Sequence, residues 1–241
     1  MDQLIHDFIY NTGYFTQFIF VVLYFLFLYF ILGHLFLYTC RIFAKKGWLE
    51  KISLQKVTRA QYLFEKKNAL ISILVFGISG FMQIYLIRFS WIELSENTLL
   101  NIVIGLIILS IWNEVHFFAV HRLLHTPFLM RNVHKIHHQS IVPTVYSSYC
   151  FHWFEAFLLS TLPLTIAPFL NFAPFSLLLY PMLNILLNFA GHSNYKFKQN
   201  FTNKYFTSLG IRHNYHHIKF SKNYGFASSL FDKLLGKIKL K

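Results

Sequence analysis

Eight histidines fall into three short clusters whose spacings suit metal coordination. The first cluster has the form His-x-x-x-His, and the second and third both have the form His-x-x-His-His. Residues three or four positions apart project from one face of an α-helix, so each cluster can present its imidazoles together. The histidines are His121 and His125; His134, His137 and His138; and His213, His216 and His217.

Imidazole is a common metal ligand, and burying this many polar rings requires partners. A tetrahedral zinc site closes at about four ligands, so eight converging imidazoles predict two metal ions. Imidazole binds zinc, copper, iron and nickel, which leaves the identity of the metal open. A single histidine on an apolar face is more often an ordinary interior residue, but three clusters with helical spacing favour a metal site.

The composition is that of a membrane protein. Of the 241 residues 55% are hydrophobic and only 13% are charged, and the chain holds 29 Phe and 14 Tyr. Mean hydropathy is +0.45. These values fall outside the range of ordinary soluble domains, and the aromatic residues suit lipid-facing and interfacial positions. We therefore predict an all-α polytopic membrane protein with about four to five apolar segments and a cytoplasmic histidine-rich metal-binding cap.

The apolar segments alternate with polar ones in a way that predicts topology. The basic segment 41–67 should be cytoplasmic, which places all three histidine clusters on the cytoplasmic side after an even number of further crossings. The last two apolar segments carry prolines, so we expect irregular spans or a hairpin there. The segments are 15–38, 69–87, 99–120, 151–172 and 175–190.

A formal net charge of +13 could indicate nucleic-acid binding in a soluble protein. Here the basic residues flank apolar spans, so we expect them to face the cytoplasmic leaflet and predict no nucleic-acid partner. Two cysteines imply no disulfide framework. The chain also lacks the HExxH, phosphate-loop and G-x-S-x-G motifs, which removes the zincin, nucleotide-binding and serine-hydrolase classes.

The three clusters, in this order on a hydrophobic scaffold, resemble the signature of the integral-membrane sterol desaturase and fatty acid hydroxylase superfamily. The resemblance covers about residues 100–241 and includes four longer motifs. These are His134-Lys-Ile-His-His-Gln-Ser-Ile-Val-Pro-Thr144, Phe151-His-Trp-Phe-Glu155, Asn223-Tyr-Gly225 and Phe231-Asp-Lys-Leu-Leu-Gly236.

The chain departs from the superfamily pattern at four positions. Trp153 stands where proline is usual, Phe231 where tryptophan is usual, and Lys233 where arginine is usual. Tyr215 precedes the final histidine pair at a position often occupied by aspartate. On this resemblance we divide the chain into N-terminal spans with a basic loop, 1–98, and a catalytic domain of the superfamily type, 99–241.

The resemblance implies an oxidoreductase that hydroxylates or desaturates a C–H bond of a lipid of the sterol, fatty acyl or sphingoid type. It implies two iron ions as cofactors, for which zinc can substitute on purification, with O2 as co-substrate. A cytochrome b5-like or ferredoxin-like protein would supply electrons. Redox chemistry on an apolar substrate also requires a dry pocket and an accessible face for electron transfer, and both fit this chain.

We assign all eight clustered histidines as metal ligands. The candidate site also includes four further residues. His192, in Gly-His-Ser-Asn, is the candidate ninth ligand. His116, His152 and Glu155 are candidates for orienting the ligands or lining the substrate entrance.

Two other functions use similar residues. A membrane zinc hydrolase acting on a lipid needs three histidines and an activated water, but leaves five histidines unexplained. A metal transporter is less consistent with clusters at the membrane boundary, because transport sites lie near the bilayer midplane.

The compartment is an integral membrane that the chain crosses several times. The short chain without a fused cytochrome domain favours a bacterial inner membrane. The terminal Lys237-Ile-Lys-Leu-Lys241 resembles a lysine-based retrieval signal, so the endoplasmic reticulum is the alternative compartment.

Overall fold

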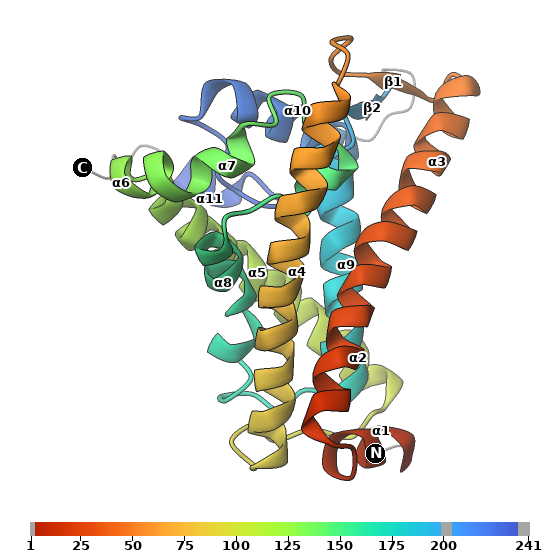
Figure 1. The fold of residues 1–241 in the computed structure, drawn as a ribbon, viewed down its shortest axis with the longest axis vertical. Helices are drawn as coiled ribbons and strands as arrows, with labels where there is room; N and C mark the ends of the chain where they lie inside the picture. The colour runs from red at the N-terminus through yellow and green to blue at the C-terminus, as the bar shows by residue number, and fades with distance from the viewer. Residues whose placement is uncertain (1–2, 199–203, 236–241) are drawn as a thin grey trace.

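The computed structural model describes residues 3–198 and 204–235. Long helices run along the longest axis, with the N-terminal helix at one end and the histidine-bearing segments at the other (Figure 1). Among the described residues, four helices are long and apolar enough to cross a bilayer: Tyr14–Lys45, Arg59–Arg88, Leu99–Leu124 and Pro174–His192. The prediction of a polytopic helical membrane protein is thus confirmed.

The first span is one continuous helical segment longer than the predicted run 15–38. It comprises α2 (Tyr14–Leu26), the π-helical turn η1 (Phe27–Leu32) and α3 (Gly33–Lys45). A short helix, α1 (Gln3–Tyr10), precedes it at the end away from the histidines.

The second and third spans, α4 (Arg59–Arg88) and α5 (Leu99–Leu124), begin with threonine caps. Thr58 Oγ1 accepts a hydrogen bond from Gln61 N, and Thr98 Oγ1 accepts one from Asn101 N. Such caps satisfy backbone amides that have no partner within the helix. The 30 residues of α4 span about 45 Å at 1.5 Å per residue, more than the hydrocarbon core requires.

The fourth predicted segment does not form a long helix. It contains α8 (Trp153–Ser160) and the 3₁₀ turn η4 (Pro163–Thr165), and then runs as non-helical chain to Phe172. Proline cannot donate the backbone hydrogen bond that would continue α8. Phe172 O accepts from Ser95 N, in the loop between α4 and α5, so the segment reaches the end opposite the histidines.

The chain then returns to the histidine end through α9 (Pro174–His192). Two short strands, β1 (Leu49–Lys51) and β2 (Tyr195–Phe197), pair antiparallel and connect the basic segment to the residues that follow α9. An ion pair between Lys196 Nζ and Glu50 Oε1, 3.0 Å long, accompanies this pairing. These two strands were not among the elements predicted from the sequence.

Short helices carry most of the histidines at this end. After α5 come α6 (Pro127–Leu129), the π-helical turn η2 (Met130–His134) and α7 (Lys135–His138). The 3₁₀ turn η3 (Val145–Tyr149) leads back into the bundle. The final helices are α10 (Lys204–Lys219) and α11 (Leu230–Leu235). The terminal lysine motif at 237–241 lies outside the described residues.

Close packing of α4 against α2 depends on two glycines. A Cβ atom added at Gly77 would lie 2.5 Å from Val22 Cγ2, and one at Gly80 would lie 2.8 Å from Val21 Cγ1. Small residues allow membrane helices to approach closely, which increases their van der Waals contact.

We predict that Gly77→Val destabilises the protein by about 1–3 kcal/mol, because the new side chain overpacks the α2–α4 contact. Thermal unfolding of the detergent-solubilised protein measures this change. Gly13→Ala is the matched control, since a Cβ there meets nothing within 4 Å. Equal melting temperatures for Gly77→Val and the control would contradict the packing argument.

Candidate metal centre

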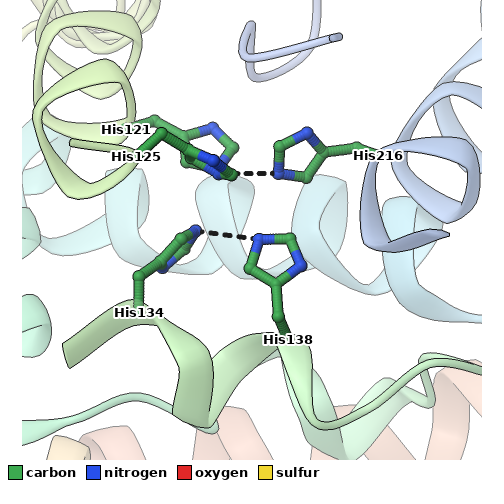
Figure 2. Close-up of side chains that lie close together, drawn as sticks. All are labelled: His121, His125, His134, His138 and His216. Carbon is green, nitrogen blue, oxygen red and sulfur yellow. Dashed lines mark hydrogen bonds between the residues drawn. The ribbon is translucent and has the colours of Figure 1, made fainter. Parts of the chain in front are cut away.

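The nine candidate ligand histidines gather into two groups at one end of the bundle. Within each group, one ring nitrogen from every member lies within 4.8 Å of the others. Figure 2 shows the first histidine group, in which the imidazoles point toward a common centre. The first group is His121, His125, His134, His138 and His216, and the second group is His137, His192, His213 and His217.

The groups do not correspond to the sequence clusters. His134 and His138, four residues apart, join the first group, whereas the intervening His137 joins the second. In α10 the arrangement is reversed, because His213 and His217 join the second group and His216 the first. Each His-x-x-His-His cluster therefore contributes to both groups, which places two potential metal sites side by side.

The spacing between ring nitrogens fits a shared metal ion. His125 Nε2 lies 3.1 Å from His216 Nε2, and His138 Nε2 lies 3.1 Å from His134 Nε2. In the second group, His213 Nε2 lies 2.8 Å from His192 Nε2 and 3.0 Å from His217 Nε2. Two nitrogens bound about 2.1 Å from one metal, at angles between octahedral and tetrahedral, lie about 3.0–3.4 Å apart.

Backbone carbonyls orient three of the imidazoles. The Nδ1–H groups of His121, His192 and His216 donate to carbonyl oxygens at 2.8, 2.9 and 2.7 Å. The acceptors are Tyr224 O, Asn188 O and Lys222 O respectively. Because a carbonyl can only accept, each ring carries its proton on Nδ1 and presents the Nε2 lone pair to its group.

Glu155 orients a fourth imidazole. Its Oε1 accepts a hydrogen bond of 2.8 Å from His134 Nδ1, and both side chains are almost completely buried. Burial raises the pKa of Glu155 well above its usual range. A metal cation on the far nitrogen of His134 would oppose this effect and favour the ionised carboxylate.

Burial also keeps the clustered imidazoles uncharged. It lowers the pKa of His134, His137, His213 and His217 well below the usual range, and lowers that of His216 to about 4. These rings are therefore neutral near pH 7, which is the form that binds a metal. The buried Nδ1 atoms of His138 and His217 have no hydrogen-bond partner in the described part of the chain. The donor set thus fits two metal ions.

The loop after α10 makes contacts that were not predicted from the sequence. Asp232 accepts from Tyr224 N and Gly225 N, and Glu114 accepts from Ala227 N and Ser228 N. These carboxylates hold the loop whose Tyr224 carbonyl orients His121. The Asn-Tyr-Gly motif was the available signal, but a backbone carbonyl leaves no trace in a sequence.

Gly225 is required by this loop, since an added Cβ would lie 2.3 Å from Ser228 O. Any other residue would displace the backbone that follows Tyr224.

The two remaining candidates lie outside both groups. His116 Nε2 lies 3.0 Å from Thr161 Oγ1, and the residue lines the large apolar cavity described below. His152 caps α8 by accepting a hydrogen bond from Phe154 N.

A cavity of about 680 Å³ lies within the bundle and reaches the residues packed against the second group. Its lining includes Phe151, whose ring lies 5.0 Å from that of His137, and Asn188, whose carbonyl holds His192. The opposite end of the cavity is bounded by Leu4, Ile5 and other residues of α1. Its size and apolar lining are typical of a pocket for a small organic ligand or lipid.

A helical membrane bundle that carries two adjacent histidine groups beside an apolar cavity defines a class of integral membrane proteins whose donor sets fit metal ions. The chain belongs to the fatty acid hydroxylase family, whose sequence profile matches residues 106–237. The matched region includes all nine clustered histidines.

Curated relatives with similar sequences are sterol enzymes. A Δ7-sterol 5(6)-desaturase of Schizosaccharomyces pombe is 34% identical over 51% of this chain and 40% of its own length. Human lathosterol oxidase is 31% identical over 58% of this chain and 47% of its own length. The matches thus span less than half of each relative. No solved structure matches significantly.

We predict that Glu155→Gln weakens metal binding by about 10- to 100-fold, because the amide cannot supply the negative charge behind His134. Competition with a chelator, read as metal retained per chain, measures the change. His152→Ala is the control: it removes only a helix cap, so stability falls by about 1 kcal/mol while metal retention is unchanged. Equal metal retention in both variants would contradict the role of Glu155.

We also predict that the chelator-treated protein loses stability as the pH falls from about 6.5 to about 4. The unfolded chain binds a proton at His216 near pH 6.5, whereas the folded chain resists protonation until about pH 4. This residue alone accounts for about 3 kcal/mol across that window. Thermal unfolding at several pH values checks the sign, and constant stability across the window would contradict it.

Proposed function

We propose that this protein is an O2-dependent oxidoreductase that hydroxylates or desaturates a C–H bond of a membrane lipid. The proposal rests chiefly on one observation, the two adjacent histidine groups at the end of an apolar cavity within a membrane bundle. An apolar substrate can reach this cavity from the bilayer, and its unactivated C–H bonds require a redox-active metal. The sterol-oxidising relatives support the same class.

In this proposal nine histidines hold two iron ions, one for each histidine group. When bound, iron would activate O2 for removal of hydrogen from the substrate. Five ligands in one group and four in the other leave coordination positions open in an octahedral site. Zinc, which is redox-inert, would occupy the groups without supporting the reaction.

The protein residues would prepare the site in three ways. Tyr224 O, Asn188 O, Lys222 O and Glu155 hold protons on the Nδ1 atoms and so fix the orientation of four ligands. Burial excludes water from the histidine groups, and the apolar cavity wall aligns the lipid. None of these contacts distinguishes hydroxylation from desaturation.

We propose that the histidine end faces the cytosol, where a cytochrome b5-like or ferredoxin-like protein would deliver electrons. Basic residues including Lys45, Lys51, Lys56 and Arg131 lie in the segments at this end. At the opposite end, Asp7, Glu93 and Glu96 accompany Arg88, the single described Lys or Arg there. This asymmetry follows the positive-inside rule. It fits both the endoplasmic reticulum and the bacterial inner membrane, and the eukaryotic relatives favour the former.

The two alternative functions gain no specific support. A mononuclear zinc hydrolase would use three histidines, whereas nine are gathered here, and Glu155 contacts a histidine rather than an open site. A transporter site would lie near the middle of the bundle, whereas both groups lie at one end.

We predict that His137→Ala abolishes lipid oxidation and lowers the metal content by about one ion per chain, while membrane insertion is unchanged. His192→Ala should lower metal content as strongly, because His192 Nε2 approaches His213 as closely as other members of its group approach one another. His6→Ala is the control, since His6 is exposed on α1. Normal oxidation by His137→Ala would refute the ligand assignment.

The class of enzyme can be tested by anaerobic expression, purification in detergent and counting of iron and zinc per chain. A reductant and O2 are then added, and the lipid products are identified by mass spectrometry. About two irons with hydroxyl or alkene formation would support the proposal. One redox-inert zinc without O2 uptake would overturn it in favour of a hydrolase.

A further inference from the structure

A cluster of side-chain amides interrupts the apolar wall of the large cavity. Asn184 Nδ2 lies 3.3 Å from Asn113 Oδ1 and 3.1 Å from the hydroxyl of Tyr180. Asn188 Nδ2 donates to Asn184 Oδ1 at 3.0 Å, which joins the third amide to the cluster. All four residues line the cavity. We call Asn113, Asn184 and Asn188 the amide cluster.

The cluster lies at bilayer depth on two membrane-spanning helices, α5 and α9. Polar residues at such positions are costly in lipid and are usually present for function. A second cavity of about 230 Å³ is also lined by Asn113, Asn184 and Tyr180, so the cluster borders open space on more than one side. It is therefore accessible to a ligand and is not enclosed in tight packing.

The cluster retains unused hydrogen-bonding capacity. Within the described part of the chain, Asn113 Nδ2 and Asn188 Oδ1 have no hydrogen-bond partner, although the other atoms of these amides do. One is a donor and the other an acceptor. A hydroxyl group both donates and accepts, so it matches this pair, whereas a hydrocarbon leaves both atoms unsatisfied.

The cavity, in the part of the chain that the structure describes, has no positive charge with which to bind an anionic ligand. No Lys or Arg is present among the described residues of its lining, and its one charged residue is Asp7, at the α1 end. A carboxylate or phosphate brought into the cavity would lose its hydration without gaining a cation. The cavity therefore favours a lipid whose polar group is uncharged.

The amide cluster lies close to the second histidine group along α9. Asn188 is four residues before His192 on α9, about 6 Å along the helix, and Asn184 is about 12 Å away at 1.5 Å per residue. From Asn188 to Pro174 the cavity wall continues for about 21 Å toward α1. A lipid with its polar group at the cluster would place nearby carbons close to the second histidine group and its apolar tail toward α1.

We propose that the amide cluster is a binding subsite for the hydroxyl group of an uncharged, sterol-like lipid alcohol, which it holds near the carbon to be oxidised. This inference deepens the proposed function, on which it rests, by assigning the polar contact that selects the substrate. Free fatty acids and phospholipids are disfavoured because their charged groups would have no cationic partner among the described residues of the cavity.

Binding tests this subsite without requiring the reaction. The full chain in detergent is titrated with the fluorescent sterol dehydroergosterol, and energy transfer from tryptophan reports occupancy. Cholesterol, its 3-methyl ether and its 3-sulfate then compete for the site. For the unmodified protein we expect the alcohol to bind about tenfold more tightly than the ether, which cannot donate, and the sulfate to bind most weakly.

Leucine substitutions locate the contact. In Asn113→Leu with Asn188→Leu, the preference for alcohol over ether should fall to within about twofold, while the ether itself still binds. Gln83→Leu is the matched control, because Gln83 lines the same cavity on α4 with an unpartnered Nε2. It should retain the tenfold preference. Loss of the preference in Gln83→Leu instead of the double variant would overturn the assignment.

The measurements on the unmodified protein remain decisive if the double variant fails to fold. No sterol binding, or equal binding of alcohol, ether and sulfate, would overturn the subsite. These outcomes are separate from failure of the proposed function. A protein that prefers the alcohol but oxidises no lipid would retain the subsite and lose the oxidoreductase assignment, whereas lipid oxidation without the preference would do the reverse.

Discussion

The structure depends on the burial of nine imidazoles at one end of a membrane bundle. Uncompensated, so many polar rings would strongly destabilise the fold, so each needs a hydrogen bond or a metal. Backbone carbonyls and one carboxylate satisfy the outer nitrogens of four rings, and the inner nitrogens converge on two centres. Metal binding would therefore contribute to stability as well as to chemistry, because apposed imidazoles gain their missing partner.

The same requirement explains why distant segments support the site. Glu65, on α4, is completely buried and accepts hydrogen bonds from Gln61, Ser140 and Thr144. It thereby holds the segment that follows His138, the last residue of the first His-x-x-His-His cluster. The first 98 residues thus pack directly against the remainder, and the proposed division at residue 98 stays a prediction from sequence.

The cavity and the histidine groups need different surroundings, and they lie at different depths in the bundle. The histidine groups need polar backbone and carboxylates, whereas the lipid needs an apolar wall, and the helices α5 and α9 serve both at different heights. Between these regions lie the amides of Asn113, Asn184 and Asn188. This gradient of polarity along two helices would orient a lipid with a polar group at one end.

The sequence by itself determined the helical membrane fold, the bounds of two spans, α5 and α9, to within four residues, and which histidines gather. Hydropathy and helical spacing are local properties, so they can be read from the residues alone. It also identified His192 and Glu155 as candidates. Only the tertiary structure decided that His137 and His138 enter different groups, that α8 ends short, and that Tyr224 O orients His121. These features depend on contacts between residues distant in the chain and on backbone atoms, which residue types do not encode.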